Sequence, residues 1–457
     1  MYSIHTFLLQ KELFRSSEPV KTSVVSSFTD TPALQQIARQ ADSDYILFYT
    51  GTSPIELHPY AIGRMYQIAE SNDGALFYSD YQEIRQGKKI HHPTLEYQTG
   101  SIRNDFDFGQ LLLFRNDSFQ QVVAQMNTDY RFAALYELRL SISRLGKIVH
   151  IPETLYTVQP TDLRLSGEKQ FDYVDPANRE VQLEMEAVCT AHLQAIGAWL
   201  APEFQRIDFG QENFAREASV IIPVRNRKRT IAEAVESALQ QQTDFSFNVI
   251  VVDNHSTDGT GQILTELSRR YPNLIHHIPA STELGIGGCW TEAILLPECG
   301  KFAIQLDSDD LYKDCHVLQR IVDTFYQENC AMVIGSYQMV DFKLEEIPPR
   351  LIAHREWTPD NGRNNALRIN GLGAPRAFYT PVLRQIKFPN VSYGEDYATA
   401  LAISRKYPIA RIYDPLYLCR RWEENSDHDL DIQQLNNYNF YKDKIRTLEI
   451  QARISGK

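Results

Sequence analysis

From Ala218 onward, short runs of apolar residues alternate with segments whose apolar residues recur at helical spacing. The runs ASVIIPV and FNVIVVDN contain almost no polar alternation, and each is followed by a segment of helical period. Strands that are buried on both faces and joined through helices form a parallel sheet with helices on both sides. We therefore predict an α/β fold with a doubly wound, mostly parallel sheet, whose ligand lies at the carboxyl ends of the strands.

The first half of the chain carries a weaker copy of part of this pattern. Residues 44–84 match residues 301–340 at a constant offset, as strand, turn, amphipathic helix and strand, and residues 142–156 resemble residues 403–417. In this alignment, the acidic run 307–310 corresponds to Thr-Gly-Thr-Ser at residues 50–53. An internal duplication is therefore indicated, in which the first copy keeps a fold and lacks a metal site.

The chain accordingly divides into four predicted parts. They are a smaller, degenerate α/β domain without a metal motif over residues 1–178, a connecting helix and linker over 179–215, a catalytic domain over 216–429 and a C-terminal helix over 430–457. The helix within 179–204 is expected from apolar residues at helical spacing, with Pro202 near its end.

Charge and cysteine content narrow the class of protein. Lys and Arg number 46 against 58 Asp and Glu, and this acidic balance argues against binding to nucleic acid. A nucleotide remains compatible with it, because one bound metal ion can neutralise a diphosphate. The six cysteines are scattered without CxxC pairs, and the chain has no apolar run of about 18 residues. We therefore expect a cytoplasmic protein with reduced thiols.

Three carboxylates follow the apolar run FAIQL and precede a predicted helix, in the sequence Asp307-Ser308-Asp309-Asp310. Crowded carboxylates repel one another, and their hard oxygens suit Mg²⁺ or Mn²⁺. Such an ion would also contact diphosphate oxygens and neutralise a leaving group. The alternative interpretation is a solvated acidic turn that caps the next helix.

Polar residues also end the two preceding strands, so that three strand ends face one crevice. Pro223, Arg225 and Asn226 end the first strand, and Asp253 and Asn254 end the second. A carboxylate at this position can accept a hydrogen bond from a base N–H or a ribose hydroxyl. Helix capping by the turn DNHSTDG is the alternative explanation.

The third group of candidates lies near the end of the predicted catalytic domain. Glu395 and Asp396 begin a helix after Gly394, where a carboxylate could take a proton from an attacking hydroxyl, or could simply complement the helix dipole. Trp422 could stack on a sugar and His428 could complete a metal shell, although both are also explained as ordinary exposed side chains.

The segments ASVIIPVRNR, FNVIVVDNHSTDGT, CGKFAIQLDSDDLY and GEDYATALAISR, in this order and spacing, resemble the family 2 glycosyltransferases of the GT-A fold. The resemblance covers about residues 216–425. It implies that Pro223 and Asp253 bind a nucleotide and that Asp307 to Asp309 bind the metal and the diphosphate. It also implies that Asp396 is the catalytic base, with Glu395 beside it for the acceptor.

The resemblance further implies an inverting transfer of sugar from a nucleotide diphosphate sugar, for which we expect a UDP-sugar with Mn²⁺ or Mg²⁺. The acceptor would be a glycan or a lipid-linked sugar in bacterial surface polysaccharide assembly, met by peripheral contact with the inner membrane face. Asn254 stands where the family often has a second aspartate, and GIGGCWTEAI (285–294) replaces a more usual small-residue helix. Trp290 in this segment could shape the sugar pocket or belong to the core.

Two rival functions are compatible with the same residues. A sugar nucleotidyltransferase also uses an α/β sheet and two metal-binding aspartates, but it usually needs a glycine-rich loop after the first strand. The segment PVRNRKRT is basic and has no glycine, which argues against that function. The other rival is a non-catalytic protein that binds nucleotide sugars or carbohydrate, which the intact acidic residues of the second half disfavour.

Overall fold

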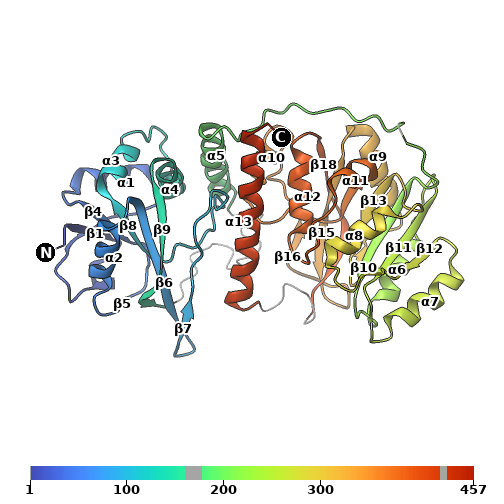
Figure 1. Cartoon of the computed structure of the whole chain (residues 1–457), viewed down its shortest axis with the longest axis horizontal. Helices are drawn as coiled ribbons and strands as arrows, with labels where there is room; N and C mark the ends of the chain where they lie inside the picture. The colour runs from blue at the N-terminus through green and yellow to red at the C-terminus, as the bar shows by residue number, and fades with distance from the viewer. Residues whose placement is uncertain (1, 160–177, 211, 423–429, 457) are drawn as a thin grey trace. The chain divides into compact units, whose positions relative to one another are not determined.

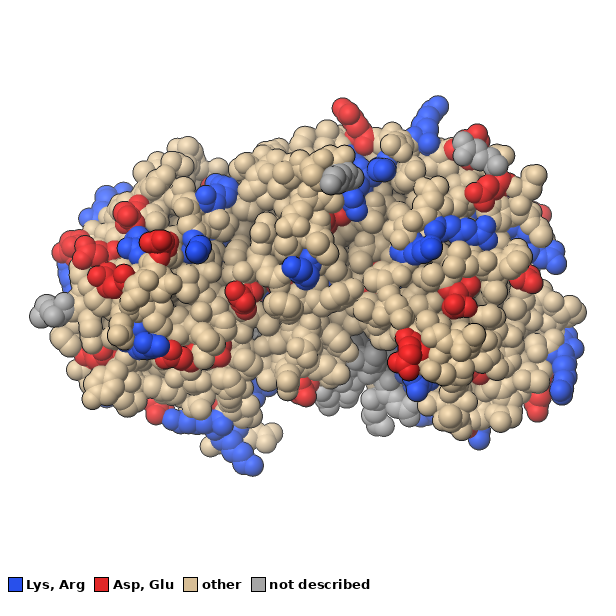
Figure 2. Space-filling view, viewed as in Figure 1, with Lys and Arg blue, Asp and Glu red and all other residues tan. Residues whose placement is uncertain are grey.

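The computed structural model describes the chain except residues 1, 160–177, 211, 423–429 and 457. The chain folds into two compact units, Met1–Trp199 with Leu430–Lys457, and Leu200–Asp429 (Figure 1). No helix within the described residues is both long and apolar enough to cross a membrane. On the face shown in Figure 2, acidic and basic side chains intermingle, so charge alone does not mark a binding surface there.

The sheet of the second unit begins with four parallel strands, of which three are the predicted runs ASVIIPV, FNVIVVDN and FAIQL. Their order is β12-β11-β10-β13, and strand β17 then pairs antiparallel with β13 before the order continues through β15, β18 and β14. The predicted α/β fold is confirmed, with a parallel half and a mixed half. The strands are β10 (Ala218–Val224), β11 (Phe247–Asp253), β12 (Leu274–His277), β13 (Phe302–Gln305), β14 (Leu311–Tyr312), β15 (Met332–Val340), β16 (Glu346–Ile352), β17 (Arg376–Tyr379) and β18 (Ile409–Arg420).

Several helices of this unit pack through one apolar stripe. Helix α9 is typical, because its buried residues Val317, Ile321 and Phe325 recur every four positions. The helices are α6 (Ile231–Leu239), α7 (Thr260–Arg270), α8 (Ile286–Leu295), α9 (Val317–Glu328), α10 (Gly362–Asn365), α11 (Thr380–Ile386) and α12 (Glu395–Ser404).

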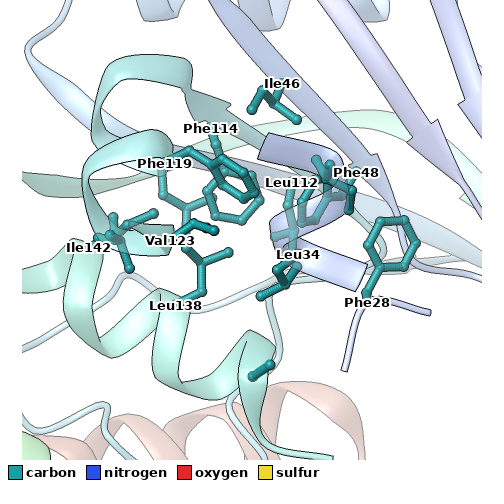
Figure 3. Packing of buried hydrophobic residues seen from close by; sticks show 14 of the residues in the cluster. Phe28, Leu34, Ile46, Phe48, Leu112, Phe114, Phe119, Val123, Leu138 and Ile142 are labelled. Atoms are coloured by element: carbon teal, nitrogen blue, oxygen red, sulfur yellow. The ribbon is translucent and has the colours of Figure 1, made fainter. Parts of the chain in front are cut away.

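The first unit contains a second sheet, of order β2-β5-β9-β6-β8-β4-β1-β3, with β7 paired to β6. Its strands are β1 (Ile4–Leu8), β2 (Phe14–Arg15), β3 (Lys21–Val24), β4 (Tyr45–Tyr49), β5 (Ile55–Leu57), β6 (Gly74–Arg85), β7 (Lys88–His92), β8 (Leu111–Arg115) and β9 (Lys147–Val158). Its helices are η1 (Lys11–Leu13), α1 (Thr31–Gln40), α2 (Ala61–Glu70), α3 (Asn116–Val123), α4 (Ala134–Leu145), α5 (Arg179–Ala195) and α13 (Ile432–Ile454). Aromatic and aliphatic side chains from β4, β8, α1, α3 and α4 fill one side of this sheet (Figure 3).

The two sheets share a sub-structure that a duplication predicts. Strands β4, β8, β6 and β9 neighbour one another in the same order and relative directions as β13, β17, β15 and β18. In both sheets a parallel strand precedes this set, β1 beside β4 and β10 beside β13. Strand β3 pairs parallel with β1, as β11 does with β10, so among the described strands of the first unit only β12 has no counterpart.

The C-terminal helix α13 belongs to the first unit, where it packs on the segment 98–103. Asp443 accepts hydrogen bonds from Ser101 Oγ at 3.0 Å and from Arg103 Nε at 3.2 Å. The amide of Gly100 donates to Thr447 Oγ1 at 2.9 Å. Helix α13 thus completes the first unit although it lies more than 300 positions further along the chain.

We expect Gly100→Ala to destabilise the first unit by about 1–3 kcal/mol, the range for overpacking of a tight contact. A Cβ atom at Gly100 would lie 2.2 Å from the carbonyl oxygen of Asp443 and 2.3 Å from the amide nitrogen of Thr447, both in the backbone of α13. Urea unfolding followed by circular dichroism measures the change. Gly210→Ala is the control, since its Cβ would meet only the Asp208 side chain, at 3.3 Å. An unchanged unfolding midpoint for Gly100→Ala would contradict this docking of α13.

Candidate active site

The carboxyl ends of β10, β11 and β13 form one edge of the second sheet, because the three strands are parallel neighbours. Backbone and side-chain hydrogen bonds connect the loops that leave them. The amide of Asn254 donates to the carbonyl of Val224 at 2.8 Å, and Thr230 Oγ1 donates to the carbonyl of Ser308 at 2.9 Å. The predicted positions Pro223, Arg225, Asn226, Asp253, Asn254, Asp307 and Ser308 therefore lie on neighbouring strand ends and their loops.

Asp253 is buried and charged at the end of β11. It accepts from the Ser256 amide at 2.9 Å and contacts His276 Nε2 at 3.3 Å. Burial opposes the charged form, but the hydrogen bonds from His276 and Ser256 outweigh it and lower the pKa of Asp253. His276 was not among the predicted residues; its position in β12, next to β11 in the sheet, was the available signal.

Asn254 is held in place by a hydrogen bond from its Nδ2 to the carbonyl of Leu284 at 2.7 Å. Its Oδ1 is buried and has no hydrogen-bond partner among the described residues. An unsatisfied buried acceptor loses its interaction with water without replacement, so a bound N–H group at this point would stabilise the site. Asn254 is also one of the two places where the sequence departs from the family that it resembles.

The acidic turn separates into two accessible carboxylates and one structural carboxylate. Asp307 accepts from Gln305 Nε2 at 2.9 and 3.1 Å, and Asp309 Oδ2 accepts from Trp422 Nε1 at 3.1 Å and lies 3.8 Å from Arg227 Nε. Asp310 is 5% exposed and accepts from the backbone amide of Arg420 at 2.8 Å. Asp310 therefore fixes the turn.

Burial raises the pKa of Asp307, and repulsion from Asp309 adds to the increase. Burial likewise raises the pKa of Asp310 well above its usual value, with repulsion from Asp309 and Asp307 in addition. A cation beside the turn would relieve this repulsion, and a hard divalent ion is suited to carboxylate oxygens. No group of three or more His, Cys, Asp or Glu side chains converges within the described part of the chain, and His428 lies outside the described residues. Asp307 and Asp309 therefore fit an ion that takes its remaining ligands from phosphate and water.

Arg376 connects the acidic turn with the helix start at residues 395–396, and the sequence analysis did not identify it. Its amide donates to Gln305 Oε1 at 3.1 Å, and its guanidinium donates to the carbonyl of Gly373 at 3.1 Å and forms an ion pair with Asp396. Burial opposes its charge, but Asp396, Asp307 and Glu395 outweigh burial and raise the pKa of Arg376. Three acidic side chains thus interact electrostatically with one fixed cation.

Glu395 differs from Asp396 although they are neighbours at the start of α12. Its Oε2 is buried, and none of the residues that the structure describes supplies a hydrogen bond to it. Burial, with repulsion from Asp396 in second place, raises the pKa of Glu395 to about 8. The predicted pair therefore separates into a neutral carboxyl group and a carboxylate that is paired with Arg376.

We expect Glu395→Gln to stabilise the second unit at pH 8 and to leave its stability at pH 4.5 nearly unchanged. The folded state retains a proton on Glu395 that the unfolded state loses above its ordinary pKa of 4.5, so wild-type stability falls as pH rises from 4.5 to about 8. Glutamine keeps the shape and removes the titration. The melting temperature at pH 8 should rise by about 2–4 °C, the shift that ~1 kcal/mol gives in a unit of this size. Equal shifts at both pH values would contradict a raised pKa.

Trp422 lies beside the acidic turn, through its hydrogen bond to Asp309. Its ring contacts Phe342 with centroids 5.2 Å apart, and the guanidinium groups of Arg227 and Arg229 lie 5.6 and 5.5 Å from the ring centroid. The indole N–H of Trp422 therefore lies at the acidic turn, where a diphosphate is predicted to bind. Trp290 is 5% exposed and packs against Phe378 and Phe388, so it belongs to the core.

Comparison with known proteins identifies similarity in this unit. Residues 219–386 match the family model described as glycosyl transferase family 2. An uncharacterized glycosyltransferase of Nostoc sp. is 32% identical over 123 residues, which are 27% of this chain and 37% of that protein. The poly(ribitol-phosphate) beta-glucosyltransferase of Bacillus spizizenii is 24% identical over 230 residues, 49% of this chain and 35% of that protein.

Among solved structures, residues 1–349 of TarS from S. aureus in complex with UDP-GlcNAc have 24% sequence identity and a TM-score of 0.40. The match covers 52% of this chain and 72% of that one. The chain spans 37% and 35% of the lengths of the two curated relatives above.

Proposed function

We propose that the second unit, whose residues 219–386 match the model of glycosyl transferase family 2, moves a sugar from a nucleotide diphosphate sugar to an acceptor hydroxyl with inversion. One observation supports this most directly. Arg376 lies between the acidic turn, where a diphosphate would leave, and Asp396, where a hydroxyl would lose its proton. We propose that the sugar binds with its anomeric carbon between the leaving diphosphate and Asp396, as an in-line displacement requires.

The residues of the strand edge would hold the donor. Asp253 is kept charged and can accept from a ribose hydroxyl. Asn254 Oδ1 has no hydrogen-bond donor within the described chain, and it could accept a hydrogen bond from the N3–H of a uracil base. We therefore propose a UDP-sugar as donor. Asp307 and Asp309 would hold Mn²⁺ or Mg²⁺, which when bound supplies positive charge to the departing diphosphate.

Asp396 would take the proton of the acceptor hydroxyl. Its ion pair with Arg376 fixes the carboxylate orientation before the acceptor arrives, and orientation of this kind is a large part of catalysis. Glu395 keeps its proton at neutral pH and can therefore donate a hydrogen bond to an acceptor oxygen, while Trp422 would contact the donor side of the site.

The acceptor is proposed to be a glycan or a lipid-linked sugar of a bacterial surface polymer. The relative in Bacillus spizizenii is named as a glucosyltransferase of poly(ribitol-phosphate), which supports this class of acceptor. A lipid-linked acceptor would be met by peripheral contact with the inner membrane face, from the cytoplasmic side.

Incubation of the whole chain with a panel of UDP-, GDP- and dTDP-sugars and Mn²⁺ tests the proposal by release of nucleoside diphosphate. We expect release from at least one UDP-sugar, abolished by a chelator. Pyrophosphate formation from a sugar phosphate and a nucleoside triphosphate would instead identify a nucleotidyltransferase. Thermal stabilisation by UDP and Mn²⁺ without release from any donor would identify a binding protein and overturn the proposed transfer.

A further inference from the structure

The first unit has an open pocket of about 500 Å³ along one side of α2. The pocket combines phenol rings with a guanidinium, an amide and a carboxylate. Its lining residues are Tyr2, Tyr60, Gly63, Arg64, Tyr66, Gln67, Glu70 and Ser71.

One wall of this pocket consists of packed tyrosine rings. The ring of Tyr2 lies 5.3 Å from that of Tyr66 at 43°, and Tyr66 in turn contacts the buried Tyr45 edge-on at 5.5 Å. Tyr45 donates from its hydroxyl to Glu70 Oε1 at 2.8 Å, which fixes this carboxylate. The absence of a side chain at Gly63 permits the close approach of Tyr2, because a Cβ there would lie 2.2 Å from the Tyr2 hydroxyl oxygen.

Tyr60 stands at the rim of the pocket and is 78% exposed. Its backbone adopts φ 64, in the left-handed region that a bulky aromatic residue rarely occupies. Neither local backbone preference nor burial of the ring accounts for a tyrosine at this position. A ring that is held at the edge of a pocket is, however, available to stack on a ligand.

The polar groups of the pocket are arranged along the same helix. Arg64 donates to Glu153 Oε1 at 2.7 Å and to Gln67 Oε1 at 3.2 Å, so both planar groups are oriented. The Gln67 amide nitrogen can donate a hydrogen bond to a ligand, and the second carboxylate oxygen of Glu70 can accept one. A sugar ring meets this combination, because its C–H face packs on phenol rings while its hydroxyl groups both donate and accept.

We propose that this pocket binds a glycan, through one or two sugar residues of the polymer that the second unit extends. The inference rests on the proposed function, since a second hold on the same polymer raises the effective concentration of its acceptor end. It assigns the first unit a carbohydrate-binding role through Tyr2, Tyr60, Tyr66 and Gln67.

The full-length chain with Asp396→Asn, which prevents turnover, is applied to an array of purified bacterial surface polysaccharides and chitooligosaccharides. We expect binding to at least one of them, and Tyr60→Gly in the same background should weaken that binding about tenfold or more, as loss of a central aromatic contact does. Tyr60→Phe keeps the ring and should retain binding. Phe440→Ala, which removes another exposed ring of the first unit, is the matched control.

Glycine tolerates positive φ, so Tyr60→Gly should fold, and Gln67→Ala provides a second variant that should also weaken binding. Equal binding by Tyr60→Gly and the parent, or binding of the parent to no glycan on the array, would overturn the inference. The glycan-binding experiment and the test of sugar transfer can be told apart by their outcomes. Glycan binding without release of nucleoside diphosphate from any donor contradicts only the transfer, and transfer without glycan binding contradicts only the pocket.

Discussion

Asp396→Asn is expected to lower kcat by about 10²–10⁴-fold, because an amide cannot accept the proton of the acceptor hydroxyl. The substitution preserves size and a hydrogen-bond acceptor for Arg376, so donor binding should change little. Release of nucleoside diphosphate in the presence and absence of acceptor measures the effect. The loss should appear in transfer to the acceptor, with a smaller change in KM for the donor.

Asp414→Asn is the matched control, since Asp414 is an exposed carboxylate on β18 of the same unit. It should transfer sugar at the parent rate. The melting temperature of Asp396→Asn must also be compared, because Arg376 loses a charged partner and some stability with it. A folded Asp396→Asn protein that transfers sugar at the parent rate would remove Asp396 as the base.

Asp309→Asn is expected to reduce kcat by about 10²–10³-fold and to raise the Mn²⁺ concentration needed for half-maximal activity. Its Oδ2 receives the Trp422 indole N–H at 3.1 Å, and the substitution leaves only Asp307 as a charged ligand at the accessible side of the turn. In the parent chain, Mn²⁺ with UDP should raise the melting temperature, and this increase should largely disappear in the variant.

Asp360→Asn, at an exposed position of the same unit, controls for a general effect of lost negative charge. Asp310→Asn tests the division of the turn into accessible and structural carboxylates. It should lower stability more than metal affinity, because the Asp310 side chain holds the backbone amide of Arg420. Unchanged Mn²⁺ dependence in Asp309→Asn would place the metal elsewhere or nowhere.

The parallel half of the second sheet could be predicted from the sequence because its pattern is local. An apolar run such as ASVIIPV must be buried on both faces, and strands of this kind joined by helices run parallel. Their carboxyl ends then share one edge, so the candidates at Pro223, Asp253 and Asp307 were expected to lie on neighbouring strand ends, where the structure places them. The roles of the individual residues stay predictions.

Arg376 and His276 were not predicted, because each meets its partner through strand pairing that no motif in the sequence specifies. Arg376 reaches the acidic turn only because β17 pairs antiparallel with β13, and no local pattern specifies that pairing. Gln305 was not predicted either, and its bond to the Arg376 amide depends on the same strand order.

The sequence by itself determined where strands end and which acids follow them, since burial patterns and motifs are properties of neighbouring residues. Only the tertiary structure decided which acids remain charged. Asp253 and Glu395 are both carboxyl groups near the predicted site, but hydrogen bonds lower the pKa of one although burial opposes it, and burial raises that of the other. Desolvation and hydrogen bonding act over a few ångströms in space, and the chain acquires those distances only when it folds.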